Sequence, residues 1–165
     1  MVIVHLITHG LFYAVIVTGY LFLLMITISA RVWGYADYSK AIRNKVPRQT
    51  KREKLLATIV GLPWLLFALG FPIFSTYVLK SKLGNEIPFW MAFLNVFVLV
   101  LLATLGDLLI LDWLVISKIT PKFVIIPGTV EEDYEDFSHH FKAHAKAAVV
   151  QILICLIIAG IVWYF

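Results

Sequence analysis

Four long apolar stretches constrain the fold of this 165-residue chain more than any other feature. A helix needs about 20 apolar residues to cross a hydrocarbon layer roughly 30 Å thick. The stretches that meet this requirement cover residues 6–30, 55–79, 89–117 and 145–165. Only 15% of all residues are charged, against about 25% in soluble domains. The sequence therefore predicts an all-α integral membrane protein, a four-transmembrane-helix bundle that forms one membrane domain over residues 1–165.

The basic residues between these stretches predict the orientation of the chain. Residues 80–88 contain only Lys80 and Lys82, whereas residues 118–144 contain Lys118, Lys122 and Lys142. The loop over residues 31–54 is the most basic, with Arg31, Lys40, Arg43, Lys45, Arg48, Lys51, Arg52 and Lys54. Because basic loops stay in the cytoplasm, we expect loops 31–54 and 118–144 on that side. Both termini would then lie outside the cell (inner) membrane.

The basic loop also predicts a lipid contact. Each basic side chain near an anionic leaflet contributes about 1 kcal/mol of attraction. No aromatic residue separates the charges between Lys40 and Lys54, so nothing resembles a base-stacking platform. We expect anionic headgroups as partners of this loop, and no nucleic acid.

Two aspartates in the third stretch need a physical explanation. Asp112 precedes Trp113, a residue type that favours the membrane interface, so we expect water to reach Asp112. Asp107 lies roughly 8 Å deeper along a helix. A central aspartate costs on the order of 3 kcal/mol in a membrane and must face other helices. Asp107 is therefore either a structural hydrogen-bonding group or a proton carrier, cation ligand or catalytic acid.

A ladder of polar residues precedes the fourth stretch. Glu132, Asp136, His140 and His144 are spaced by four, so they share one side of a helix. His140 and His144 have the spacing that lets two imidazoles reach one metal ion, and Asp136 could add a carboxylate ligand. The alternative is simple pairing along a wet helix face, and we favour it over a divalent metal. His5 and His9 repeat the spacing, but at the predicted outer side.

The segment between the third and fourth stretches predicts a short amphipathic cytoplasmic helix. Thr129 and Glu132 have the spacing of a capping box, which places a helix start at Thr129. This helix could run straight into the fourth stretch or meet it at a bend. The apolar run 121–128 is too short to cross a membrane, so it dips into the interface or packs under the bundle.

Two classes of function fit these patterns. In the first, Asp107, Asp112, His140 and His144 are candidate catalytic residues of a cytoplasm-facing site that acts on or carries a lipid-like or small apolar substrate. In the second, the chain has no chemistry of its own and is a membrane subunit, an assembly factor or a lipid-interacting partner. A homo-oligomer or a membrane protein partner fits either class. The sequence does not decide whether the protein is an enzyme, and it identifies no cofactor.

Overall fold

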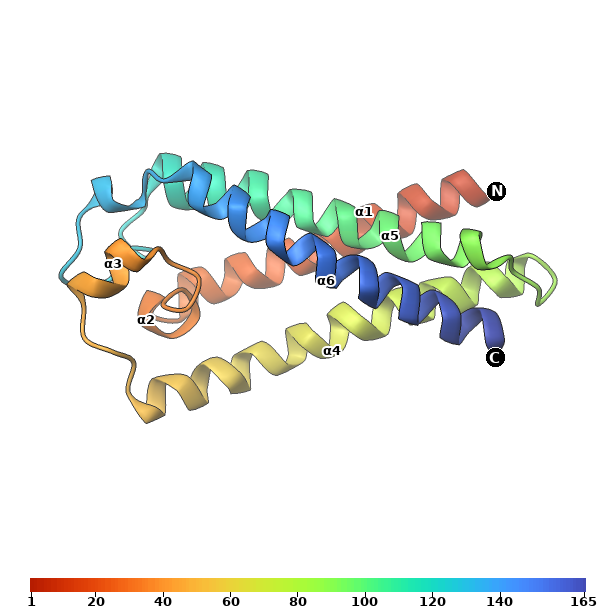
Figure 1. Ribbon diagram of the computed structural model, residues 1–165, viewed down its shortest axis with the longest axis horizontal. Coiled ribbons are helices and arrows are strands. Elements are labelled where there is room, and N and C mark those ends of the chain that lie inside the picture. Colours follow the sequence, from red (N-terminus) through yellow and green to blue (C-terminus); the bar gives the residue numbers. More distant parts are fainter.

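The computed structural model describes residues 1–165 and contains no strands. Four of its helical segments are long and apolar enough to cross a membrane, which confirms the predicted architecture (Figure 1). They are α1 (Val2–Thr27), α4 (Lys51–Lys82), α5 (Phe89–Gly106) continued by η1 (Asp107–Ile119), and α6 (Phe137–Tyr164). The short elements α2 (Ala30–Trp33), α3 (Lys40–Lys45) and η2 (Glu131–Tyr134) lie in the two basic loops.

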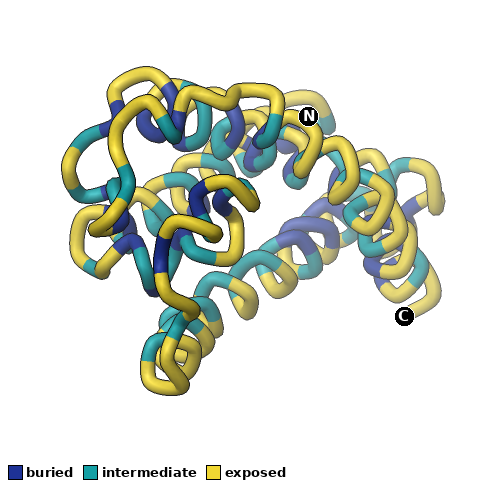
Figure 2. The backbone as a smooth tube through the Cα atoms, turned by 60° about the vertical axis from the view of Figure 1, so that its left-hand side comes forward, coloured by how far each residue is buried: buried dark blue, intermediate teal, exposed yellow.

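Helix α5 is the centre of the bundle, and it packs against α1, α4 and α6. Its buried face carries small or branched side chains such as Ala92, Val96 and Ala103, which let neighbouring helices approach closely. Helix α4 packs differently. Its buried residues all lie between Pro72 and Leu79. Its N-terminal half diverges from α5 and α6 and stays exposed or half-buried (Figures 1 and 2).

A proline explains one bond between α4 and α1. Pro72 has no N–H, so the carbonyl of Ala68, one turn earlier, has no helical donor. The hydroxyl of Tyr13 on α1 donates a hydrogen bond of 3.0 Å to that carbonyl. In lipid, every backbone polar group needs a partner from the protein. This bond therefore satisfies the freed carbonyl and holds α4 next to α1.

The third spanning segment changes its helix type at Asp107. From Asp107 to Ile119 its backbone forms a π-helix of 13 residues, in which each N–H bonds to the carbonyl five residues earlier. The segment ends at Thr120, which has a left-handed φ of 44° and precedes Pro121, which cannot continue the helical hydrogen bonds. Long π-helices are rare, and short ones are frequent at functional sites.

The two basic loops pack together beneath the bundle. Tyr38, Val124 and Tyr134 are fully or nearly fully buried in one cluster with side chains of η1. The Tyr38 hydroxyl donates to the Val124 carbonyl at 2.9 Å, and the Tyr134 hydroxyl accepts from the Ile126 N–H at 2.9 Å. The apolar run 121–128 therefore packs under the bundle, which is one of its two predicted placements.

A short helix before α6 is present, but its N-cap differs from the prediction: the 3-10 helix η2 begins at Glu131 with Val130, not Thr129, as its N-cap. Helix α6 starts at Phe137, with Asp136 as its N-cap, and runs straight into the fourth span. Thr129 caps no helix. Its hydroxyl donates to the Ile126 carbonyl at 2.7 Å and lies 2.8 Å from the Tyr134 hydroxyl. The buried tyrosine thus engages Thr129 in the loop core, and the predicted box with Glu132 does not form.

Replacing Gly34 with alanine should loosen this loop layer. A Cβ atom at Gly34 would lie 2.8 Å from Cζ of the Tyr38 ring, and that ring is only 1% exposed. Overpacking of this kind costs about 1–3 kcal/mol. We expect Gly34→Ala to lower the thermal unfolding temperature in detergent. Gly160→Ala is the matched control, because a Cβ there meets nothing within 4 Å. Equal melting temperatures for the two variants would contradict the packing described.

Candidate functional site

The helix type of η1 brings Asp107 and Asp112 onto one face. In an α-helix each residue turns by about 100°, so residues five apart lie about 140° apart around the axis. A π-helix bonds residues five apart, so the two aspartates stand on successive turns of η1. The five-residue spacing visible in the sequence would therefore have separated the two carboxylates on an ordinary helix.

Two histidines of α6 hold the Asp112 carboxylate. His140 Nδ1 lies 3.2 Å from Asp112 Oδ1, and His144 Nε2 lies 2.8 Å from Asp112 Oδ2. The two imidazoles can reach the same group because residues four apart are neighbours on a helix surface. Both oxygens of one carboxylate thus have an imidazole partner, which fixes η1 against α6 at this level.

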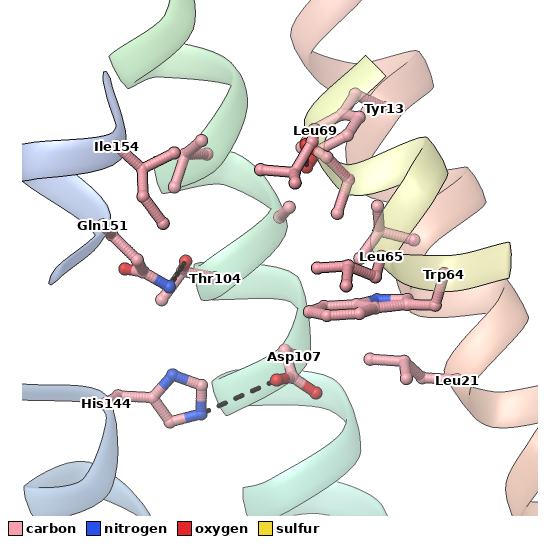
Figure 3. A pocket seen from close by; sticks show the side chains of 14 residues that line it. Tyr13, Leu21, Trp64, Leu65, Leu69, Thr104, Asp107, His144, Gln151 and Ile154 are labelled. Atoms are coloured by element: carbon pink, nitrogen blue, oxygen red, sulfur yellow. Dashed lines mark hydrogen bonds and ion pairs between the residues drawn. The ribbon is translucent and has the colours of Figure 1, made fainter. Parts of the chain in front are cut away.

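Asp107 occupies the more open side of the cluster. Its Oδ2 atom lies 3.8 Å from His144 Nε2, beyond hydrogen-bonding distance, and Figure 3 marks this ion pair. The Asp107 side chain is 33% exposed, against 14% for Asp112. The groups that pair with these two aspartates are all histidines, since no lysine or arginine forms an ion pair with either.

The structure does not place Asp136 with His140 and His144 as one set of metal ligands. The Asp136 carboxylate caps α6, accepting bonds from the Ser138 hydroxyl at 2.8 Å and the His139 N–H at 3.0 Å. A residue at the N-cap position uses its side chain on the backbone of the first turn. The residues that could share a metal ion are instead Asp107, Asp112 and His144, whose ligand atoms lie within 4.8 Å of one another.

Asp37 is a neighbour that sequence reasoning missed. It lies in the loop after α2, and its backbone carbonyl lies 2.8 Å from His139 Nε2. Although its residue surface remains partly exposed, burial by the surrounding protein raises the pKa of the Asp37 carboxyl, and the nearby Asp112 raises it further, while His140, Arg43 and His139 oppose the change. Asp37 is thus a third carboxylate near the cluster. The fold of the loop after α2 brings Asp37 near the cluster.

A cavity of about 170 Å³ extends from Asp107 and His144 between the four long helices. Figure 3 shows the two residues at one end and Tyr13, Leu69 and Ile154 toward the other. Ten of the 14 lining residues are hydrophobic. An apolar cavity of roughly 150 Å³ can hold one benzene molecule. The space therefore fits a small ring or a segment of an alkyl chain, with carboxylate and imidazole groups at its polar end.

The remaining polar groups of the cavity wall are few. The Gln151 side chain donates to the Thr104 hydroxyl at 3.2 Å, so these two groups satisfy each other across α5 and α6. The indole N–H of Trp64, on α4, is buried without a partner. Figure 3 shows Trp64 and Asp107 among the residues that line the cavity. The wall thus offers one donor without a partner in the protein.

His5 belongs to a separate buried network, and the His9 ring lies against it with 3.7 Å between the ring centroids. His5 Nε2 lies 3.1 Å from the Ser75 carbonyl, and Asn95 donates to the hydroxyls of Ser75 and Thr76 at 3.2 and 2.9 Å. These residues lie near the start of α1 and the end of α4, whereas Asp112 lies on η1 beside the loop layer. The two histidine pairs therefore do not form one site.

No family model, curated protein or solved structure matches this chain. The function is therefore inferred from the geometry of the site.

The raised pKa of Asp37 predicts a pH-dependent variant. Since folding raises this pKa, the ionised carboxylate destabilises the folded state at pH values above its folded pKa, and this cost disappears as the pH falls toward the ordinary value of 3.8. Asp37→Asn should therefore raise the melting temperature near pH 8, with a smaller gain near pH 4. Glu135→Gln, at an exposed acid without an ion pair, should show no such trend. A gain for Asp37→Asn that is independent of pH would contradict this account.

Proposed function

We propose that this protein binds a lipid-like or small apolar molecule in the cavity and exchanges a proton with its polar group through Asp107 and His144. The observation that carries the proposal is the position of this acid and this imidazole at the polar end of a mainly apolar cavity. A carboxyl and an imidazole together can give and accept a proton. Proton exchange of this kind serves either a reaction or the transport of the bound molecule.

The size of the cavity and the position of α4 support a membrane-derived ligand. Ligand sites usually enclose about 300–1,000 Å³, so a space of about 170 Å³ holds only part of a lipid. The part of α4 before Pro72 contributes Trp64, Leu65 and Ala68 to the wall and contains no buried residue. A ligand chain can therefore extend from the cavity along the diverging α4 into the surrounding lipid.

The proposed orientation follows from the basic loops. With loops 31–54 and 118–144 in the cytoplasm, the acid–histidine cluster opens toward the cytoplasmic half of the membrane. Arg31 pairs with Glu53 at 2.7 Å, and Lys45 pairs with Asp133. The other basic residues of loop 31–54 form no ion pair within the protein, so they can bind anionic headgroups.

A photoactivatable fatty acid tests the binding proposal. We expect a diazirine-bearing fatty acid to crosslink to the cavity wall, at Leu65 or Ile154, in the detergent-solubilised protein. Ala68→Phe should reduce this labelling severalfold because the added ring fills the cavity that Ala68 lines. Leu66→Phe is the matched control, since Leu66 is 64% exposed on the same helix. Equal labelling of the two variants would refute the cavity as the binding site and favour a subunit without its own chemistry.

Cysteine labelling tests the orientation. Cys155 is the sole cysteine and is buried, so the native chain should react poorly with an impermeant maleimide. In intact cells we expect Glu86→Cys to be labelled, because residue 86 is exposed in the loop between α4 and α5. Asn44→Cys, exposed in loop 31–54, should react only after the membrane is opened. Neither substitution removes a basic residue that could set the topology. Labelling of Asn44→Cys but not Glu86→Cys in intact cells would show the opposite topology.

A further inference from the structure

Three side chains of the acid–histidine cluster have the types and spacing of metal ligands. His144 Nε2 lies 2.8 Å from Asp112 Oδ2 and 3.8 Å from Asp107 Oδ2, and one ligand atom from each residue lies within 4.8 Å of the other two. Metal–ligand bonds of about 2.0–2.2 Å place the ligands of a tetrahedral zinc ion roughly 3.4 Å apart. The observed separations lie on both sides of this value, so small rotations of the side chains would complete the set.

The charge at the cluster favours a cation. Asp107 and Asp112 pair only with histidines, and Asp37 adds a third carboxylate nearby. Unpaired charge in a membrane segment is costly. A divalent cation would neutralise the aspartates while the histidines remain neutral, which is the form in which imidazole binds metals.

The surroundings of the three side chains resemble those of known metal sites. His140 Nδ1 lies 3.2 Å from Asp112 Oδ1, so this contact orients the carboxylate and leaves Oδ2 toward His144. Partners of this kind fix the geometry of metal ligands. Asp107 lines the cavity together with His144, so the open side of the set faces the space proposed for the ligand. Catalytic zinc sites likewise have three protein ligands and one open position.

We propose that Asp107, Asp112 and His144 bind one divalent transition-metal ion, with zinc as the reference case. The donor set of one imidazole and two carboxylates suits zinc, iron(II) or manganese(II). Metal binding by itself does not depend on the proposed function. Its catalytic consequence does: with the ion bound, Asp107 and His144 would act as its ligands instead of exchanging a proton themselves, and the ion would polarise an oxygen of the bound molecule at the polar end of the cavity. His140 is then a positioning residue that acts through Asp112.

The test is a titration of the EDTA-treated full-length protein in detergent with Zn²⁺ alone, followed by calorimetry and by metal analysis after gel filtration. We expect one Zn²⁺ per chain. Asp107→Asn and His144→Gln should each weaken binding by at least about 100-fold, and His140→Gln by roughly 10- to 100-fold. Asp136→Asn and His139→Gln are matched controls on the same helix, since neither residue belongs to the ligand set, and both should bind Zn²⁺ like the wild type.

Two further measurements make the result decisive. Replacing Zn²⁺ with Co²⁺ should give the visible absorption of a coordinated ion in wild type and in Ala68→Phe, the cavity-filling variant, whether or not fatty acid labelling succeeds. Far-ultraviolet circular dichroism checks that each variant is folded. The proposal is overturned if the folded wild type binds no Zn²⁺, or if Asp107→Asn and His144→Gln bind it as tightly as His139→Gln. Fatty acid labelling that persists in either case would leave the cavity proposal standing without a metal.

Discussion

The contact between the Asp112 carboxylate and the two histidines of α6 is the interaction on which the site depends. A carboxylate within a membrane span has no water shell to stabilise it, so its partners must come from the protein. Here each oxygen of Asp112 faces one imidazole, at 3.2 and 2.8 Å. This contact joins η1 to α6 and leaves Asp107 toward the cavity. Asp107 and Asp112 therefore have different environments although they lie on the same helix.

The divergence of α4 gives this protein its interior space. Helix α5 packs closely against α1 and α6, whereas α4 is buried only near its C-terminal end. The Tyr13 hydroxyl, bonded to the carbonyl freed by Pro72, fixes α4 at the level of Ala68. Beyond that point toward Lys51, α4 moves away from α5 and α6 (Figure 1), while the Tyr20 hydroxyl of α1 still donates to the Val60 carbonyl at 2.7 Å. The cavity lies where this divergence begins, with its polar end formed by η1 and α6.

The sequence predicted the four helices because apolar runs of about 20 residues are stable as helices that cross the hydrocarbon core of a membrane. It also identified Asp107, Asp112, His140 and His144, since polar residues stand out in such runs. Three features depended on tertiary structure and could not be predicted. The π-helix of η1 brings the aspartates together, the folded loop brings Asp37 to them, and the buried Tyr134 hydroxyl draws Thr129 away from the predicted helix cap. Asp37 comes to the aspartates from a distant part of the sequence. Thr129 contacts the Tyr134 hydroxyl instead of capping a helix.

The π-helix also limits how the length of this segment can vary. Residues four apart share a face of an α-helix, whereas residues five apart share a face of η1. A chain one residue shorter between Asp107 and Asp112 could align both carboxylates on an ordinary α-helix. A homologous protein could thus carry the same acid pair at a spacing of four with no π-helix. Spacing and helix type would then have to change together, and a deletion here would be tolerated better than a substitution of either aspartate.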